Sequence, residues 1–387
     1  MLLVFLRLGC TSFGGPVAHL GYFRTELVER RRWLDEAGYV DIVALCQFLP
    51  GPASSQVAAT LGALRAGLMG ALAAWLGFTL PSALAMIAFG YGVAGFGGFH
   101  QPWLHGLKIV AVAVVAQAVW AMARKLCPDR ERASVAVGAA LLALFLPSAA
   151  GQIGAIVAAA VIGWCFFPAP AAQRAVPLAI RIPRRVAVLS LGLFFGLLFG
   201  LPLLATASDS HAIALVNGFY RSGALVFGGG HVMLPLLQET VVPPGWVGND
   251  AFLAGYGAAQ ALPGPLSTFA AYLGTVMGPA PNGWPGGLLC LAAIYLPSFL
   301  LLLGVLPFWD ALRVRAGVRS ALTGVNAAVV GLLLAALYTP VWTSAIAAPA
   351  DFAIAIGAFL MLALWQVPPW AVVICGALAA TGLAAIG

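Results

Sequence analysis

The stretch Gln47-Phe48-Leu49-Pro50-Gly51-Pro52-Ala53-Ser54-Ser55 returns in the second half of the chain as Gln260-Ala261-Leu262-Pro263-Gly264-Pro265-Leu266-Ser267-Thr268. A tryptophan, Trp33 or Trp246, stands 14 residues before the glutamine of each copy, so the copies align without a gap. Because proline lacks a backbone N–H and glycine tolerates a positive φ, each Pro-Gly-Pro is expected to end one helix and start another. The sequence therefore predicts two related halves that are broken by the same motif.

Further paired motifs extend the repeat over most of the chain, the later ones after small insertions. The pairs are Phe13-Gly14-Gly15-Pro16 with Phe227-Gly228-Gly229-Gly230, Leu80-Pro81-Ser82 with Leu296-Pro297-Ser298, and His105-Gly106-Leu107-Lys108 with Thr323-Gly324-Val325-Asn326. We expect an N-terminal repeat over 1–167, a basic linker plus one apolar helix over 168–211, and a C-terminal repeat over 212–387.

Composition places these repeats in a membrane. Of the 387 residues, 62% are hydrophobic and 8% are charged, and the mean hydropathy is +1.00. Apolar stretches of about 20 residues, the length of a membrane-spanning helix, recur from end to end. The net charge of +7 lies in short connections, without the basic face that nucleic-acid binding requires. The six cysteines stand singly, so we predict neither a metal site nor a cofactor.

The positions of the basic residues predict the orientation of each half, because basic loops face the cytoplasm. Loops such as 236–250 contain no Lys or Arg, and the basic residues cluster at 24–32, 65, 124–132, 174–185 and 313–319. Every loop lies on the side that its charge predicts only if the segments around the glycine motifs are re-entrant hairpins. Their arms have about 11 residues, a length that spans about half of the hydrocarbon core.

The predicted fold is an all-α polytopic membrane protein with two inverted-topology repeats. Each repeat contains two re-entrant helical hairpins and about four transmembrane helices, and one extra transmembrane helix joins the repeats. The N-terminus then faces the cytoplasm and the C-terminus faces outward. Gly192, Gly196 and Gly200 lie on one face of the joining helix, which permits close packing within the protein or in a homodimer.

Helix breaks inside a membrane free backbone groups that must face protein or a polar cavity. The start of each new helix carries a partial positive charge, so we expect the breaks to bind an anion near the bilayer midplane. A lone Pro-Gly-Pro is more often a mere kink, but two inverted copies followed by hydroxyl residues favour a site. The remaining cations in apolar segments are Arg7, Arg221 and Lys108, which either bind the anion or extend toward the membrane surface.

The predicted substrate-binding residues are Gly14, Gly15, Gly51, Pro52, Ser54, Ser55, Lys108, Arg221, Gly228, Gly229, Gly230, Gly264, Pro265, Ser267 and Thr268. Three further residues are candidates for coupling transport to protons. His19 and His231 carry imidazoles that titrate near neutral pH, and Asp41 is a carboxylate beside the first Pro-Gly-Pro. The alternatives are a structural hydrogen bond for each histidine and a salt bridge for Asp41.

Four stretches resemble the chromate ion transporter family in its long, two-domain form: Ser12-Phe13-Gly14-Gly15-Pro16-x-Ala18-His19-Leu20, Arg30-Arg31-Arg32-Trp33, Leu49-Pro50-Gly51-Pro52 and Phe227-Gly228-Gly229-Gly230. The resemblance covers nearly the whole chain. It implies a multi-pass secondary transporter of the bacterial inner membrane that exports chromate and confers chromate resistance. The motifs are more specific for the family than for the anion, and Met233 replaces His19 in the second half.

The predicted function is therefore export of a tetrahedral oxyanion, chromate or a sulfate-like ion, by alternating access. Uptake or channel-like conduction of sulfate or another small anion is the alternative. A membrane oxidoreductase is disfavoured, because the chain lacks dinucleotide-binding glycine motifs, histidine pairs for haem and cysteine clusters. We predict that the protein is not an enzyme, that lipid and the anion are its partners, and that bulky residues at Gly51 or Gly264 abolish export with expression intact.

Overall fold

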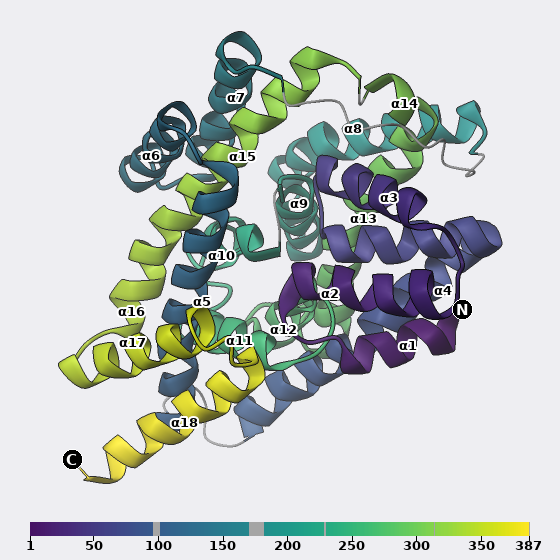
Figure 1. Cartoon of the computed structure of the whole chain (residues 1–387). Coiled ribbons are helices and arrows are strands. Elements are labelled where there is room, and N and C mark those ends of the chain that lie inside the picture. The colour runs from purple at the N-terminus through teal and green to yellow at the C-terminus, as the bar shows by residue number, and fades with distance from the viewer. Residues whose placement is uncertain (96–100, 170–181, 228–229, 313, 387) are drawn as a thin grey trace.

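The computed structural model describes residues 1–95, 101–169, 182–227, 230–312 and 314–386, and these residues form helices and short connections (Figure 1). Among the described residues, five helical segments are long and apolar enough to cross a membrane: Ala53–Val93, Pro102–Leu126, Arg184–Ala207, Gly283–Phe308 and Ala316–Ala345. Shorter apolar helices accompany them. The prediction of an all-helical polytopic membrane protein is confirmed. Residues 174–181 of the predicted basic linker, together with His100, Gly228 and Gly229, lie outside the described residues.

The first glycine motif separates two short helices, α1 (Leu2–Thr11) and α2 (Gly15–Phe23). Gly14 has a φ of 96° and Pro16 occupies the first turn of α2, where a missing N–H costs nothing. The basic cluster at 24–32, which was predicted to lie in a loop, is largely helical, because α2 continues as a π-helix over Arg24–Arg30. Salt bridges from Arg24 to Glu29 and Glu36 support this extension.

The first Pro-Gly-Pro separates α3 (Glu36–Phe48) from α4 (Ala53–Gly95). Asp35 caps α3 by accepting a hydrogen bond from the Gly38 N–H. The long α4 is interrupted at Ala66 and Gly67, whose backbone angles are not helical. It therefore consists of a short arm after the motif and a longer helix that starts at Leu68.

The second half has corresponding elements around its own breaks. They are α9 (His211–Ala224), a 3-10 turn (Gly230–Val232), α10 (Met233–Val241), α11 (Asn249–Ala261), a 3-10 turn (Leu266–Thr268) and α12 (Phe269–Val276). The predicted loop over 236–250 begins later than expected, since α10 extends to Val241.

The other main helices connect and flank these elements. They are α5 (Pro102–Leu126), α6 (Arg130–Phe145), α7 (Ala149–Phe166), α8 (Arg184–Ala207), α13 (Gly283–Val305), α15 (Ala316–Ala336), α17 (Pro349–Ala363) and α18 (Pro369–Ile386). Four of them, α6, α7, α17 and α18, have 15 to 18 residues, shorter than the roughly 20 of a typical membrane span.

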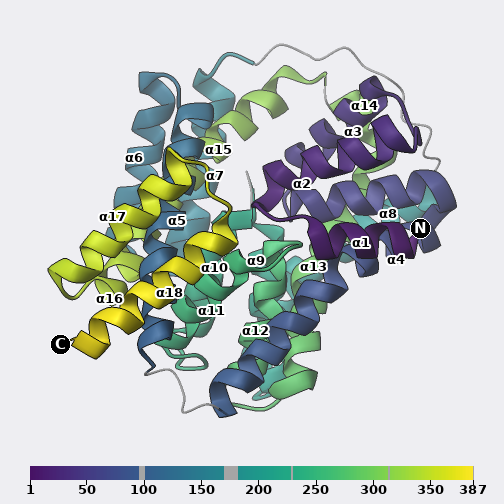
Figure 2. The same ribbon diagram turned by 60° about the horizontal axis from the view of Figure 1, so that its bottom comes forward.

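The packing joins helices from opposite halves of the sequence. Helix α15 lies against α6 and α7, and α5 lies against α17 and α18, as Figures 1 and 2 show. Glycines permit the close approach: Gly324 backs onto Ala159 of α7, and its repeat partner Gly106 backs onto Gly376 of α18. We call these six helices, α5, α6, α7, α15, α17 and α18, the bundle unit.

The remaining main helices, α1 to α4 and α8 to α13, form what we call the hairpin unit. In it α1 packs on α4 and α9 packs on α13, while α12 lies between α4 and α13. Their buried aromatic side chains, among them Phe5, Phe23 and Phe78, form edge-to-face contacts. Gly192, Gly196 and Gly200 of α8 have no other part of the described chain close to them, so their face does not make the predicted internal packing.

Candidate functional site

The helix breaks of the two halves meet in the hairpin unit. The Gly51 N–H in the first Pro-Gly-Pro donates to the Val226 carbonyl before the second glycine motif, with an N···O distance of 2.6 Å. Reciprocally, the Gly264 N–H donates to the Ser12 carbonyl before the first glycine motif, at 2.9 Å. Each Pro-Gly-Pro tip is therefore held by the opposite half, and backbone groups freed by the breaks satisfy one another.

A serine from the opposite half packs against each central glycine. Gly51 has a φ of 125° and Gly264 a φ of 98°, conformations that favour glycine. A Cβ added at Gly51 would overlap Ser298 Oγ, and one at Gly264 would lie 2.8 Å from Ser82 Oγ. Ser82 and Ser298 come from the paired Leu-Pro-Ser motifs, so close contact as well as backbone conformation requires glycine at both tips.

A buried hydroxyl cluster joins the two Pro-Gly-Pro tips. Tyr295 Oη on α13 lies 3.2 Å from Ser55 Oγ at the start of α4, and the Ser267 hydroxyl also interacts with it. Thr79 is the repeat partner of Tyr295. Ser54 and Thr268, like the others, are at most 3% exposed. Sequence reasoning missed Tyr295, although it directly precedes the Leu-Pro-Ser motif.

The first glycine motif faces an open cavity of about 480 Å³ between the hairpin and bundle units. Gly14 and Gly15 line it at the start of α2. The polar side chains around it are Tyr22 of α2, Gln117 of α5, His231, Gln260 of α11 and Gln366 between α17 and α18. No Asp, Glu, Lys or Arg is among its lining residues in the described part of the chain. Gln260 Nε2 is buried without a hydrogen-bond partner in that part.

The two predicted histidines have different surroundings. His231 lines this cavity, and its Nδ1 lies 2.8 Å from Tyr256 Oη on α11. His19 is 1% exposed and packs edge-to-face on Phe78, with its ring centroid 5.3 Å away. No hydrogen bond of ordinary geometry reaches either ring nitrogen of His19 from the described residues. Asp41, the third coupling candidate, is 5% exposed on α3.

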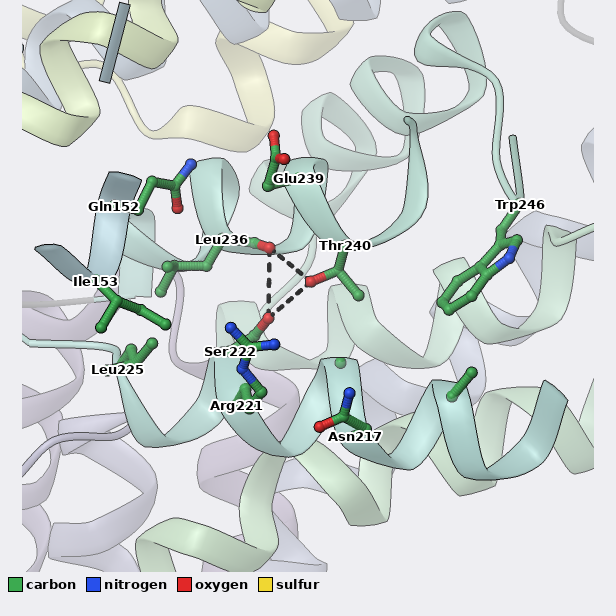
Figure 3. Close-up of a pocket in the computed structure, with 12 residues that line it drawn as sticks. Gln152, Ile153, Asn217, Arg221, Ser222, Leu225, Leu236, Glu239, Thr240 and Trp246 are labelled. Carbon is green, nitrogen blue, oxygen red and sulfur yellow. Dashed lines mark hydrogen bonds between the residues drawn. The ribbon is translucent and has the colours of Figure 1, made fainter. Parts of the chain in front are cut away.

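Arg221 lines a different cavity, of about 210 Å³, between α9, α10 and the start of α7 (Figure 3). Glu239 lies on the same cavity, where Ser222 and Thr240 share a hydrogen bond of 3.2 Å. Arg221 is thus not brought to the cavity at Gly14 and Gly15.

Its repeat partner Arg7 lines a corresponding cavity of about 610 Å³ between α1 and α2, together with Glu26 and Arg30. A 2.7 Å hydrogen bond from Arg31 Nε lowers the pKa of the Glu26 carboxyl. Each arginine therefore shares a cavity with a carboxylate.

Lys108 forms an ion pair with Asp250, with Nζ 2.9 Å from Oδ1. Lys108 was predicted to bind the anion. Its partner could not be predicted from the spacing of the sequence, because 142 residues separate Lys108 from Asp250. Within the described residues no group of three or more His, Cys, Asp or Glu side chains is gathered that could hold a metal ion.

The family model for chromate transporters matches residues 1–164 and 213–381, which include both sets of breaks. The chain belongs to the chromate transporter family. The resemblance of the sequence motifs to this family is confirmed, and its members are transport proteins and not enzymes.

Named relatives support this membership. A probable chromate transport protein of Synechococcus elongatus is 29% identical over 86% of this chain and 82% of its own. A chromate transport protein of Cupriavidus metallidurans is 27% identical over 87% and 81%. An uncharacterized transporter of Methanocaldococcus jannaschii is 28% identical over 86% and 81%. No solved structure matches the chain.

Proposed function

We propose that this chromate transporter family member is a secondary active transporter that exports chromate from the cytoplasm by alternating access. The observation that carries the proposal is the meeting of the helix breaks of both halves, through the hydrogen bonds of Gly51 with Val226 and of Gly264 with Ser12. Paired breaks at the junction of repeats are typical of transporter substrate sites. The names of the relatives supply the anion, chromate.

The proposed substrate site is the cavity beside Gly14 and Gly15. The start of α2 offers backbone N–H groups and a partial positive charge, and the amides of Gln117, Gln260 and Gln366 add neutral donors. A tetrahedral dianion can exchange its hydration shell for such donors. The Pro-Gly-Pro residues Gly51, Pro52, Ser54, Ser55, Gly264, Pro265, Ser267 and Thr268, with Gly230, then support the site as a rigid centre rather than lining this cavity.

The proposed membrane arrangement is two inverted repeats with re-entrant hairpins in the bacterial inner membrane. The arms α1, α3 and α12 have 8 to 13 residues, or roughly 12–20 Å of helix, too short for a hydrocarbon core of about 30 Å. His231 is the strongest coupling candidate, because it lies in the cavity beside the anion and contacts Tyr256. His19 and Asp41 remain candidates deeper in the hairpin unit.

Counterflow in proteoliposomes tests this function. Vesicles loaded with unlabelled chromate should accumulate labelled chromate, and an imposed proton gradient should drive net transport if protons are the coupling ion. If the vesicles accumulate labelled sulfate but not labelled chromate, the substrate is sulfate and not chromate. A chromate current without counterflow would favour the channel-like alternative, and absence of both would refute anion transport.

A further inference from the structure

Helices α5 and α11 form a closed contact between the bundle and hairpin units. Leu107 and Val110 of α5 share an apolar core with Ala254 and Ala258 of α11. Gly257 backs directly onto the Leu107 backbone, so no larger residue fits there. At one end of this contact Lys108, whose side chain is 11% exposed, meets Asp250 in the first turn of α11.

The repeat partners of these helices, α15 and α3, are held apart. A cavity of about 390 Å³ lies between them, lined by Val40, Ala44 and Gln47 of α3 and by Thr323 and Asn326 of α15, among others. The gap-free alignment pairs Ala44 with Gly257, and the later motif, aligned after small insertions, pairs Asn326 with Lys108. One position from each touching pair of the α5–α11 contact, that of Gly257 and that of Lys108, therefore corresponds to a residue that lines a cavity between α15 and α3, Ala44 or Asn326.

The Lys108–Asp250 pair is not repeated at the aligned positions of the open contact. Asp250 aligns with Ala37, and Lys108 aligns with Asn326, so neither of these two positions carries a charge on α3 or α15. When two inverted repeats exchange conformations, the contact that is closed in one half opens while its partner closes. Lys108 and Asp250 can therefore meet in only one of the two end states.

We infer that Lys108 and Asp250 are a gate pair on the outer side of the protein, and that Lys108 acts on transport through Asp250 rather than by touching the anion. The inference rests on the proposed function. The loop 242–248, which precedes α11, has no Lys or Arg, whereas Arg319 lines the cavity of the open contact and Arg315 precedes α15. The structure then corresponds to a state open to the cytoplasm, with the pair holding the outer side closed.

A charge exchange tests this role. Lys108→Asp and Asp250→Lys should each lower chromate efflux by about three- to tenfold, the expected range for a partly exposed pair that biases two states. The double variant Lys108→Asp/Asp250→Lys should recover most of the efflux. Labelled chromate should bind the purified single variants with affinity close to that of the unaltered protein. Asp129→Ala, which breaks the 2.9 Å pair with Arg132 within one helix end, is the control and should transport normally.

An anion-binding Lys108 predicts the opposite pattern. Lys108→Asp would then weaken chromate binding, removal of the Asp250 carboxylate in Asp250→Ala would strengthen it, and the exchanged pair would stay inactive. Any of these three results overturns the gate role.

A second readout does not depend on the transported anion. In Asn326→Cys, a membrane-impermeant maleimide should label position 326 from the cytoplasmic side, quantified by peptide mass spectrometry. Adding Lys108→Asp should reduce that labelling about three- to tenfold as the outer side opens, and adding Asp250→Lys as well should restore it. Labelling that is unaffected by either charge, or that occurs only from outside, refutes the gate. Absence of chromate transport with this labelling pattern intact would refute only the proposed substrate.

Discussion

The Pro-Gly-Pro tips and the tip at Gly14 and Gly15 are helix breaks of similar chemistry in different surroundings. The Pro-Gly-Pro tips are packed in a buried cluster with Ser55, Ser267 and Tyr295, each of which is at most 1% exposed. Gly14 and Gly15 instead line a cavity with Gln260. The comparison indicates that a broken helix becomes either a rigid centre or a binding surface, depending on what packs against its tip.

The largest expected effect comes from filling the packed tips. Gly51→Val and Gly264→Val each place a Cβ on a residue with a positive φ, which costs about 1–3 kcal/mol. Each added Cβ also overlaps or crowds the buried serine that packs against the glycine. We therefore expect loss of transport together with a lower yield of folded protein, measured by size-exclusion chromatography and thermal unfolding in detergent. The expectation of intact expression, made from the sequence alone, is thus revised.

Two variants sharpen that result. Gly138→Val on α6, where the added side chain meets open space, should retain both yield and transport. Combining Gly51→Ala with Ser298→Gly removes the overlapping hydroxyl and should recover part of the yield. Full stability of Gly51→Val would show that the tip is not packed as described.

Removing a donor from the open tip comes next. Gln260→Leu should raise the half-saturating chromate concentration about tenfold or more, since a hydrogen bond to a charged group contributes roughly 1.5–3 kcal/mol. Unfolding temperature should change little, because Gln260 Nε2 has no protein partner among the described residues. Gln238→Leu, outside this cavity, is the matched control. Equal transport by the two variants would remove Gln260 from the site.

A smaller effect is expected at the cavity of Arg221. Arg221→Glu places a second carboxylate beside Glu239 and should slow anion passage about three- to tenfold, more at low than at high salt. Arg7→Glu makes the equivalent change beside Glu26 in the other half. Complete loss of counterflow in Arg221→Glu at high salt, with normal folding, would instead place Arg221 at the substrate.

The smallest expected effect tests whether the packed tips stay closed to the anion. Tyr295→Phe removes the hydroxyl that meets Ser55, so the free energy of unfolding should fall by about 1 kcal/mol. Chromate efflux should stay within about twofold of that of the unaltered protein, a smaller change than the roughly tenfold change in half-saturating concentration predicted for Gln260→Leu. A large loss of efflux with unchanged stability would mean that the anion reaches the Pro-Gly-Pro centre.

Most of the local structure could be predicted, because it depends on residues close in sequence. Helices begin at Gly15 and Ala53, as the prolines and glycines predicted. The π-helical continuation of α2 was missed, since salt bridges from Arg24 stabilise a segment that its charge made look like a loop. The grouping of site residues was predicted less well: Lys108 and Arg221 lie apart from the cavity at Gly14.

The sequence by itself determined the membrane class, the positions of the helix breaks and the family, because hydropathy, backbone chemistry and motifs are properties of neighbouring residues. Only the tertiary structure decided that each Pro-Gly-Pro tip forms a hydrogen bond with the opposite half and that Tyr295 lies between the two tips. It also decided that Lys108 forms an ion pair with Asp250. Burial and ion pairing depend on which distant segments pack together, and two halves with similar sequences can pack differently at equivalent positions.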